Sequence, residues 1–331
     1  MFKGLFDNFP WSTIIMILLL GVVVIGSLLL YKKMQKRAGT CLLISAALIA
    51  IALVLSLCNL GINMGIDFAG GLSIKYDMGD VFEDADIEAA LKNAGIKDYQ
   101  IVHAGSEQHE LQLRVKSIDS EEGVEALRTS IEGELVQKYT EMKTNDATVS
   151  YVGGTASTTL LKNAVLAVLI AAACMLIYIA LRFDLGMGAA AVLGLVHDVL
   201  IMLAFMVFFR SFMQMNSTFV AAMLTIVGYS INNTIIIFDR VRENHNKTAL
   251  ASLSRVQIVE KSVKESLGRT INTTLTTLVT ILALYILGVD SIKEFALPII
   301  IGILAGAYSA NLINGYIWAV IPEKKVAKAA R

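Results

Sequence analysis

The stretch that decides the fold of this 331-residue chain is residues 227–244, which read VGYSINNTIIIFDRVREN. It begins as an apolar helix and ends in charges, and two adjacent amides, Asn232 and Asn233, interrupt the apolar part. Unpaired amides are expensive inside a membrane, so both are predicted to face the interior of a helix bundle. Asn233 lies six residues before Asp239, which is about 9 Å along a helix. The stretch therefore predicts a membrane helix with a polar interior and a charged end.

The composition of the whole chain supports this reading. Hydrophobic residues make up 56% and charged residues 17%, with 28 basic and 28 acidic side chains. A soluble domain has about 45–50% apolar and about 25% charged residues, so a soluble enzyme is excluded, and the balanced charge argues against a nucleic-acid binder. Cys41, Cys58 and Cys174 all lie in apolar runs, so we predict neither a disulfide framework nor a thiolate metal site.

Seven stretches are long and apolar enough to cross a bilayer core of about 30 Å as helices. They are residues 12–31, 40–62, 159–181, 186–209, 215–238, 270–288 and 294–320. The first is followed directly by four basic residues in 32–37, which is a stop-transfer pattern and predicts a retained helix, not a signal peptide.

Basic residues gather in alternate loops, which predicts the orientation, because such loops stay in the cytoplasm. Four lie in 32–37, one is Arg182, seven lie in 239–269 and four lie in the C-terminal tail. We expect the N-terminus outside and the C-terminus in the cytoplasm.

The polar segment 63–157 carries 18 acidic and 8 basic residues and is expected on the outer face. Alternation of apolar and polar residues predicts strands, and capping signals predict helices. The expected elements are strands 71–76, 99–104, 110–115 and 147–152, a short helix 86–93 and a helix capped by Ser120 that continues to Tyr139. The order βαββαβ predicts a small ferredoxin-like α+β domain.

Three further features of the sequence have both a functional and a structural interpretation. His197 and Asp198 lie at the centre of the fourth span, where an ionisable group costs roughly 2.5–3.5 kcal/mol; they are either part of an ion pathway or a hydrogen bond between helices. Arg269, at the start of the sixth span, is either part of the same polar centre or a snorkelling anchor. Gly302, Gly306 and Ala310 recur every four residues and predict close helix packing.

Two segments combine glycines or charges with a motif-like spacing. Residues 65–71 read GIDFAGG. The glycines and Asp67 are typical of a turn before a strand, and the paired glycines would also let the polar domain lie close to a membrane helix. Stretch 227–244 ends in four charged residues whose spacing allows ion pairs along a helix: Asp239, Arg240, Arg242 and Glu243. They are either a functional motif or the solvated end of the helix. No phosphate loop, nucleophile elbow or HExxH helix occurs, so neither an enzyme nor a cofactor or metal site is expected.

Together these residues resemble the SecF family, over roughly residues 45–320. The residues that carry the resemblance are Gly65, Asp67, Gly70, Gly71, His197, Asp198, Gly228, Tyr229, Ser230, Ile231, Asn232, Asp239, Arg240, Arg242, Glu243, Asn244, Gly268, Arg269 and Thr270. The resemblance implies a helical bundle of the RND type that works with SecD beside the SecYEG channel, near a YidC-type insertase, and uses proton flow to move preproteins. It also implies that an aspartate in the Gly-Tyr-Ser-Ile-Asn-Asp run and an arginine, matched by Arg269, lie on the proton path.

Three departures from the family pattern bear on the mechanism. Position 233 is asparagine in place of aspartate and cannot release a proton, so coupling would rest on SecD, on Asp198 or on another ion. Position 69 is alanine where threonine is common. Residues 1–38 add a span that the six-span family core lacks.

The sequence thus predicts a polytopic helical membrane protein of the bacterial inner membrane with five parts. These are an extra helix and basic loop (1–38), the first core helix (39–62), the outer domain (63–157), a five-helix bundle (158–321) and a basic tail (322–331). The leading hypothesis is a protein-export subunit that promotes late translocation or release of preproteins with the proton motive force. The alternatives are a non-conducting scaffold of the translocon, favoured by Asn233, and an RND-type efflux component, disfavoured by the compact outer domain.

Overall fold

The computed structural model describes residues 35–321, apart from 59, 97–98, 105–108, 116–120 and 211–212. The predicted first span, 12–31, and the basic tail therefore lie outside the described residues, as does Ser120. Within the described residues the chain forms two compact units. The sheet unit comprises Met64–Leu166 and Met215–Ser217, and the helix unit comprises the rest.

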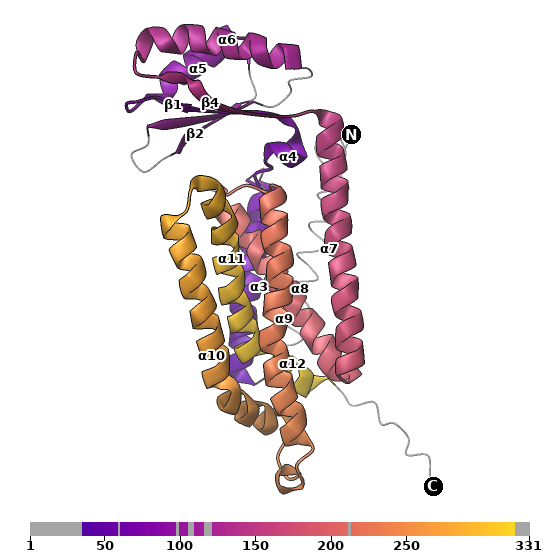
Figure 1. Ribbon diagram of the computed structural model, residues 1–331. Helices are drawn as coiled ribbons and strands as arrows, with labels where there is room; N and C mark the ends of the chain where they lie inside the picture. The colour runs from indigo at the N-terminus through magenta and orange to yellow at the C-terminus, as the bar shows by residue number, and fades with distance from the viewer. Residues whose placement is uncertain are drawn as a thin grey trace. The chain divides into compact units, whose positions relative to one another are not determined.

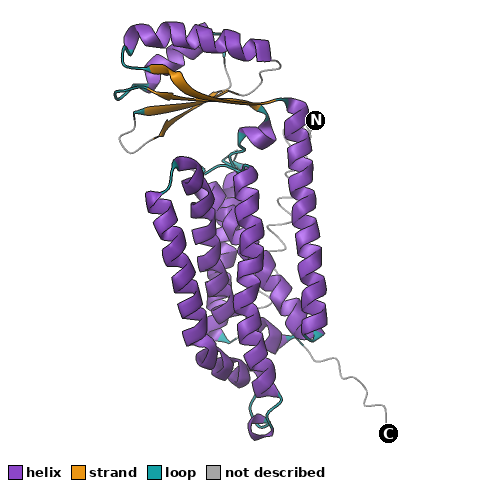
Figure 2. Cartoon of the chain, in the orientation of Figure 1, coloured by secondary structure: helices purple, strands orange, loops and turns teal. Residues whose placement is uncertain are grey.

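A four-stranded antiparallel sheet is the centre of the sheet unit. Its strands are β1 (Gly71–Asp77), β2 (Tyr99–Ala104), β3 (Glu110–Val115) and β4 (Lys143–Val152), in the order β2-β3-β1-β4. Helices α5 (Asp84–Asn93) and α6 (Glu121–Lys138) cover one face of it (Figure 2). The elements follow one another as the sequence predicts, although β4 begins four residues earlier. Beyond a register shift Lys143 pairs with Asp77, and their side chains form an ion pair of 2.6 Å.

Alternation along the strands builds the core of the sheet unit. Tyr76 pairs with Leu111 across β1 and β3, and Ile74 pairs with Leu113, so these apolar side chains point to the same face. That face packs against buried residues of both helices, among them Ile87 and Ile131. The core is thus a single layer between the sheet and the two helices.

Six helices of the structure are long and apolar enough to cross a membrane (Figure 1). They are α3 (Lys36–Leu57), α7 (Gly154–Arg182), α8 (Leu185–Phe208), α9 (Ser217–His245), α10 (Arg255–Leu287) and α11 (Asp290–Ser309) with its continuation. This continuation is a π-helical turn (Ala310–Asn314) followed by α12 (Gly315–Val320). Each of the six overlaps a predicted span.

The helix ends differ from the predicted spans at their polar termini. Helix α9 ends seven residues after the predicted end at 238, and α10 begins fifteen residues before the predicted start at 270. The additional turns are polar, and side-chain contacts that a hydropathy pattern cannot predict stabilise them. Ser254 caps α10 in a capping box with Gln257, and a one-turn 3-10 helix (Thr248–Leu250) precedes it. Helix α3 ends at Leu57, five residues before the predicted end of its span.

Small residues on α11 let it approach α9 closely, as the sequence predicts. A Cβ added to Gly302 would lie 2.5 Å from Ile226, and one added to Gly306 would lie 3.0 Å from Ser230. Helix α8 packs against both α3 and α11, and α10 packs against α11. In contrast, α7 and α10 leave many apolar side chains exposed, so these two helices present faces suited to lipid or to another membrane protein.

Candidate functional site

A carboxylate at the centre of α8 is completely buried in the helix unit. Asp198 has no exposed surface, and its Oδ1 lies 2.8 Å from Nδ1 of the neighbouring His197. Its Oδ2 accepts hydrogen bonds from Ser309 Oγ on α11, at 2.9 Å, and from Ser230 Oγ on α9. Three helices therefore meet at this group: α8 brings two polar side chains, and α9 and α11 bring one each. We call Asp198, His197, Ser230 and Ser309 the carboxylate cluster.

A second polar layer lies one turn along the same three helices. Asn314 Nδ2 donates to Thr234 Oγ1 at 2.9 Å, and the facing residue of α8 is Gly194. A Cβ added to Gly194 would lie 2.3 Å from the Asn314 amide, so only glycine leaves room for it. The π-helical turn places Asn314 here. In a π-helix the backbone hydrogen bonds join residues i and i+5, so Asn314 lies one turn after Ser309 on the same side of the helix. Asn314 is 1% exposed.

Several buried polar atoms around these layers have no hydrogen-bond partner among the residues that the structure describes. They are His197 Nε2, Asn233 Oδ1 and Asn314 Oδ1. The His197 ring is stacked 6.3 Å from the ring of Tyr308, whose hydroxyl donates to the Cys41 carbonyl at 2.8 Å. Buried groups of this kind are normally satisfied by internal water. Of these three atoms, His197 Nε2 belongs to the carboxylate cluster.

The two adjacent amides of α9 do not share an environment, so the prediction that both face the bundle interior is wrong for Asn232. Asn233 is fully buried and its Nδ2 lies 3.4 Å from Thr274 Oγ1 on α10, whereas Asn232 is exposed. Successive residues of a helix point about 100° apart, so two neighbours can have different surroundings, as Asn232 and Asn233 do here. Gly228 is exposed as well, and the Tyr229 hydroxyl donates to the Thr273 carbonyl at 3.1 Å.

Arg269 is not part of the buried cluster. Its side chain is exposed on α10 and makes no hydrogen bond or ion pair with the described part of the chain, while the next residue, Thr270, is fully buried. Thr270 Oγ1 lies 3.2 Å from Asn311 Oδ1 on the π-helical turn. Of the residues predicted for the polar centre, the structure thus brings His197 and Asp198 together, buries Asn233 against α10, and turns Asn232 and Arg269 outward.

Sequence reasoning missed the partners that complete the site: Ser309, Asn314 and Thr234, together with the role of Ser230. Polar residues in otherwise apolar spans are a usable signal, but Ser309 and Asn314 are five residues apart. That spacing matches neither face of an ordinary α-helix, so only the π-helical turn brings them together.

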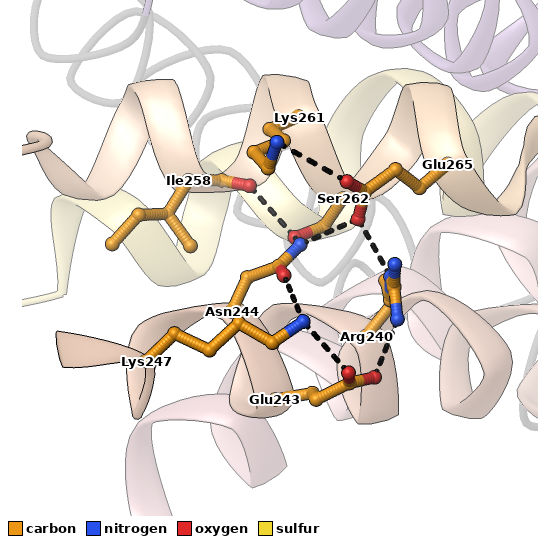
Figure 3. A network of polar contacts seen from close by, with 8 residues as sticks. All are labelled: Arg240, Glu243, Asn244, Lys247, Ile258, Lys261, Ser262 and Glu265. Carbon is orange, nitrogen blue, oxygen red and sulfur yellow. Dashed lines mark hydrogen bonds and ion pairs between the residues drawn. The ribbon is translucent and has the colours of Figure 1, made fainter. Parts of the chain in front are cut away.

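The charged end of α9 forms a second polar network, which joins α9 to α10 (Figure 3). Arg240 bonds both Glu265 and Glu243 at 2.6 Å, and the fully buried Asn244 donates to Ser262 Oγ at 3.0 Å and to Glu265 at 2.7 Å. Lys247 bonds Glu243 at 2.8 Å. We call these residues the helix-end network. The predicted pairing along the helix is present, and further contacts of equal length run between helices.

Two more charged motif residues connect α9 with the end of α7. Asp239 accepts from Arg182 at 3.0 Å and lies 3.3 Å from Arg242, which in turn donates to the Arg182 carbonyl. Both guanidinium groups lie within 6 Å of the Phe183 ring, at 5.7 and 5.9 Å from its centroid. These residues therefore hold the ends of α7 and α9 together, which is a structural role.

Two of the three glycines of the GIDFAGG segment are favoured by its backbone. A single helical turn, α4 (Ile66–Ala69), is followed by Gly70 with φ of 72° and Gly71 with φ of 122°, conformations that favour glycine. Asp67, in that turn, accepts a hydrogen bond from the backbone nitrogen of Ser217 at 2.8 Å. Its carboxylate therefore caps the distant helix α9, not a local turn.

Comparison with known proteins identifies the family. The family model "Protein export membrane protein SecD/SecF, C-terminal" matches residues 132–324. The protein translocase subunit SecF of Thermodesulfovibrio yellowstonii is 34% identical over 266 residues, 80% of this chain and 86% of that one. The SecF of Calditerrivibrio nitroreducens is 35% identical over 295 residues, 87% of this chain and 94% of that one.

Longer fused proteins match as well. The SecDF of Bacillus subtilis is 31% identical over 86% of this chain and 37% of its own length. The crystal structure of SecDF from Thermus thermophilus superposes with a TM-score of 0.71 at 31% identity, over 86% of this chain. This chain spans 38% of that SecDF chain. The polytopic helical fold, the family motif residues and these matches agree: the chain belongs to the SecF family of inner-membrane protein translocase subunits.

Proposed function

We propose that this chain is the SecF-type accessory subunit of protein export and works with a SecD partner to promote late translocation or release of preproteins. The family assignment supports the export role, and the carboxylate cluster supports coupling to the proton motive force. Asp198 is the one fully buried carboxylate in the described residues, and it lies midway along a membrane helix. Ionisable groups at such positions typically serve ion or proton pathways. Asp198 is the single observation that carries the proposal.

Protonation of Asp198 would change contacts between helices. As a carboxylate it accepts from Ser230 on α9 and Ser309 on α11, and His197 lies against its other oxygen. A protonated carboxyl group gains an O–H donor and loses its negative charge, so it holds the Ser230 and Ser309 hydroxyls less strongly than the carboxylate does. The bonds that join α8 to α9 and α11 would therefore weaken on protonation, and Asn233, an amide, leaves this role to Asp198.

The exposed Arg269 supports a partner in the membrane. A guanidinium group on the outward face of a membrane-spanning helix is costly unless it snorkels or pairs with an anion. Asn272, three residues further along α10, is also exposed. A carboxylate of the SecD partner next to this face would satisfy Arg269, and the long exposed apolar faces of α7 and α10 provide area for the contact.

The charge bias of the loops supports one orientation in the membrane. Basic residues near the His245 end of α9 favour the cytoplasm for that end, with the C-terminus inside and the N-terminus outside. The sheet unit is then extracytoplasmic, where it would meet preproteins leaving the SecYEG channel, with a YidC-type insertase as a further neighbour. Its sheet order and βαββαβ sequence support a ferredoxin-like domain.

Export of a secreted protein into inverted membrane vesicles tests the proposal. SecA, ATP and SecD are held constant, the proton gradient is kept or collapsed, and the wild type is compared with Asp198→Asn, which keeps the shape of the side chain. We expect the wild type to speed late export only with the gradient intact, and the variant to lose that gain. Gradient-independent stimulation by both proteins would instead favour the scaffold alternative, to which Asn233 points. No stimulation by the wild type under either condition would refute the export role.

A further inference from the structure

Asp67 makes a contact that the export role does not by itself explain. Its Oδ2 accepts from the backbone nitrogen of Ser217, the first residue of α9, at 2.8 Å, although 150 residues separate the two in sequence. The first amides of a helix have no partners within the helix, and a carboxylate satisfies them and the positive end of the helix dipole. Caps normally come from the residue just before the helix. Here the cap comes from a different segment of the sheet unit.

A backbone contact fastens the same segments together beside the cap. Met64 and Met215 form a parallel β-bridge, in which the nitrogen of Gly65 donates to the Met215 carbonyl at 3.0 Å. Residues 64–67 and 215–217 are therefore joined by this backbone bridge and by the Asp67 side chain. The side-chain acceptor can be removed by substitution while the backbone bridge remains.

The other end of the GIDFAGG segment is tightly held by the sheet. Gly71 opens β1 and pairs with Val152 at the end of β4, and the Phe68 side chain is buried. A Cβ on Gly70 would lie 3.2 Å from Ser157 Oγ in the first turn of α7. With its backbone fixed at both ends, α4 has little freedom to move independently of the sheet. A displacement of the sheet is thus passed to Asp67, and through Asp67 to the start of α9.

We infer that Asp67 is a positioning residue that fastens the first turn of α9 to the sheet unit, so that movement of α9 in the membrane is transmitted to the outer domain. The inference rests on the proposed function and names its mechanical link. Ser230, which bonds Asp198, lies thirteen residues further along the same continuous helix, about 20 Å from Ser217. A change in the carboxylate cluster and a change at the Asp67 cap therefore act on one helix.

The test compares Asp67→Ala, which removes the acceptor, with Asp67→Asn, whose amide oxygen can still accept from Ser217. We expect Asp67→Ala to lower gradient-dependent export about fivefold, the factor typical of a lost helix cap, and Asp67→Asn to keep most of it. Asp146→Ala is the matched control, because it removes an exposed carboxylate from β4 of the same unit. Hydrogen exchange of residues 215–222 should rise about fivefold in Asp67→Ala alone.

A disulfide tests whether fastening alone replaces the Asp67 carboxylate, since it joins the two segments without restoring the charge. Met64→Cys and Met215→Cys are placed at the bridge partners, whose spacing of about 4.8 Å suits a disulfide, in an Asp67→Ala chain without Cys41, Cys58 and Cys174. Oxidation should restore export and reduction should remove the gain. Wild-type export by Asp67→Ala, or no rescue on oxidation, would overturn the inference. If the wild type itself gives no stimulation of export, the proposed function fails. The hydrogen-exchange measurement stands apart from that result: unchanged exchange of residues 215–222 in Asp67→Ala would show that Asp67 does not fasten the start of α9.

Discussion

The carboxylate cluster and the helix-end network both join α9 to neighbouring helices through polar side chains, but their charges are balanced differently. In the helix-end network, Glu243 and Glu265 are surrounded by Arg240, Lys247 and Lys261, and these side chains are partly exposed. Asp198 is fully buried, and His197 is the only titratable group among its hydrogen-bond partners in the described residues.

This difference separates a structural contact from a responsive one. If one partner of the helix-end network is lost, water can solvate the other, so each ion pair contributes little. A buried carboxylate has no such alternative, so its charge depends on the hydrogen bonds of the side chains around it. The helix-end network therefore braces the bundle, and under the proposed function the carboxylate cluster is the part that would respond to protons.

The largest effect is expected when the centre of the carboxylate cluster is removed. Asp198→Ala leaves Ser230, Ser309 and His197 without their buried acceptor, and we expect it to lower the free energy of unfolding by about 3 kcal/mol. Asp198→Asn keeps an acceptor and should cost clearly less. Thermal denaturation of the purified proteins in one detergent measures both. Equal melting temperatures would show that these hydrogen bonds do not stabilise the bundle.

Gly194→Ala tests the second polar layer. The added methyl group would lie 2.3 Å from the Asn314 amide and would displace it from Thr234, so we expect a loss of about 2 kcal/mol. Gly188→Ala, on the same helix, is the matched control, since its Cβ would meet Ile179 at an ordinary 3.4 Å. A neutral Gly194→Ala would mean that Asn314 does not occupy this layer.

Removal of the one buried amide of the helix-end network should have a smaller effect. Asn244→Ala abolishes donation to Ser262 and Glu265, but Ser262 keeps its bond to the Ile258 carbonyl and Glu265 keeps Arg240. We expect a loss of about 1–2 kcal/mol. The exposed Asn246→Ala is the control, and the same thermal assay applies. A loss as large as that of Asp198→Ala would erase the proposed distinction between the two regions.

The smallest effect is expected for the ion pair between Arg240 and Glu265. Their side chains are 34% and 27% exposed, so a double-mutant cycle with Arg240→Ala and Glu265→Ala should give a coupling below about 1 kcal/mol. The coupling should fall further when salt is raised. A coupling of several kcal/mol that salt leaves unchanged would identify this pair as buried in the working protein.

Hydropathy predicted the six described spans because a run of about twenty apolar residues permits little else in a bilayer. The same argument could not find the true helix ends: α9 and α10 extend through charged turns that are stabilised by contacts with each other, such as Arg240 with Glu265. Alternation predicted the strands, but it could not predict that β4 begins at Lys143, because that depends on pairing across a register shift to Asp77.

The functional residues divide in the same way. Asp198 could be singled out from sequence, since a carboxylate within an apolar run is costly wherever it lies. Its partners could not, because Ser230, Ser309 and Asn314 come from other helices and one of them depends on a π-helical turn. Asn232 was predicted to face inward, yet it is exposed. The Asp67 cap on α9 joins segments 150 residues apart, and no local pattern could reveal it.

The sequence by itself determined that this is a polytopic membrane protein with one small polar domain, a buried carboxylate at residue 198 and an amide where its family carries an acid. The first three follow from the cost of placing each residue type in lipid or water, which depends on the residue and its immediate neighbours, whereas the amide was noted by comparison with the family pattern. Only the tertiary structure decided which helices share Asp198, that Arg269 faces outward, and that Asp67 caps α9. Those are contacts between distant segments, and their geometry is set by how the helices and the sheet pack.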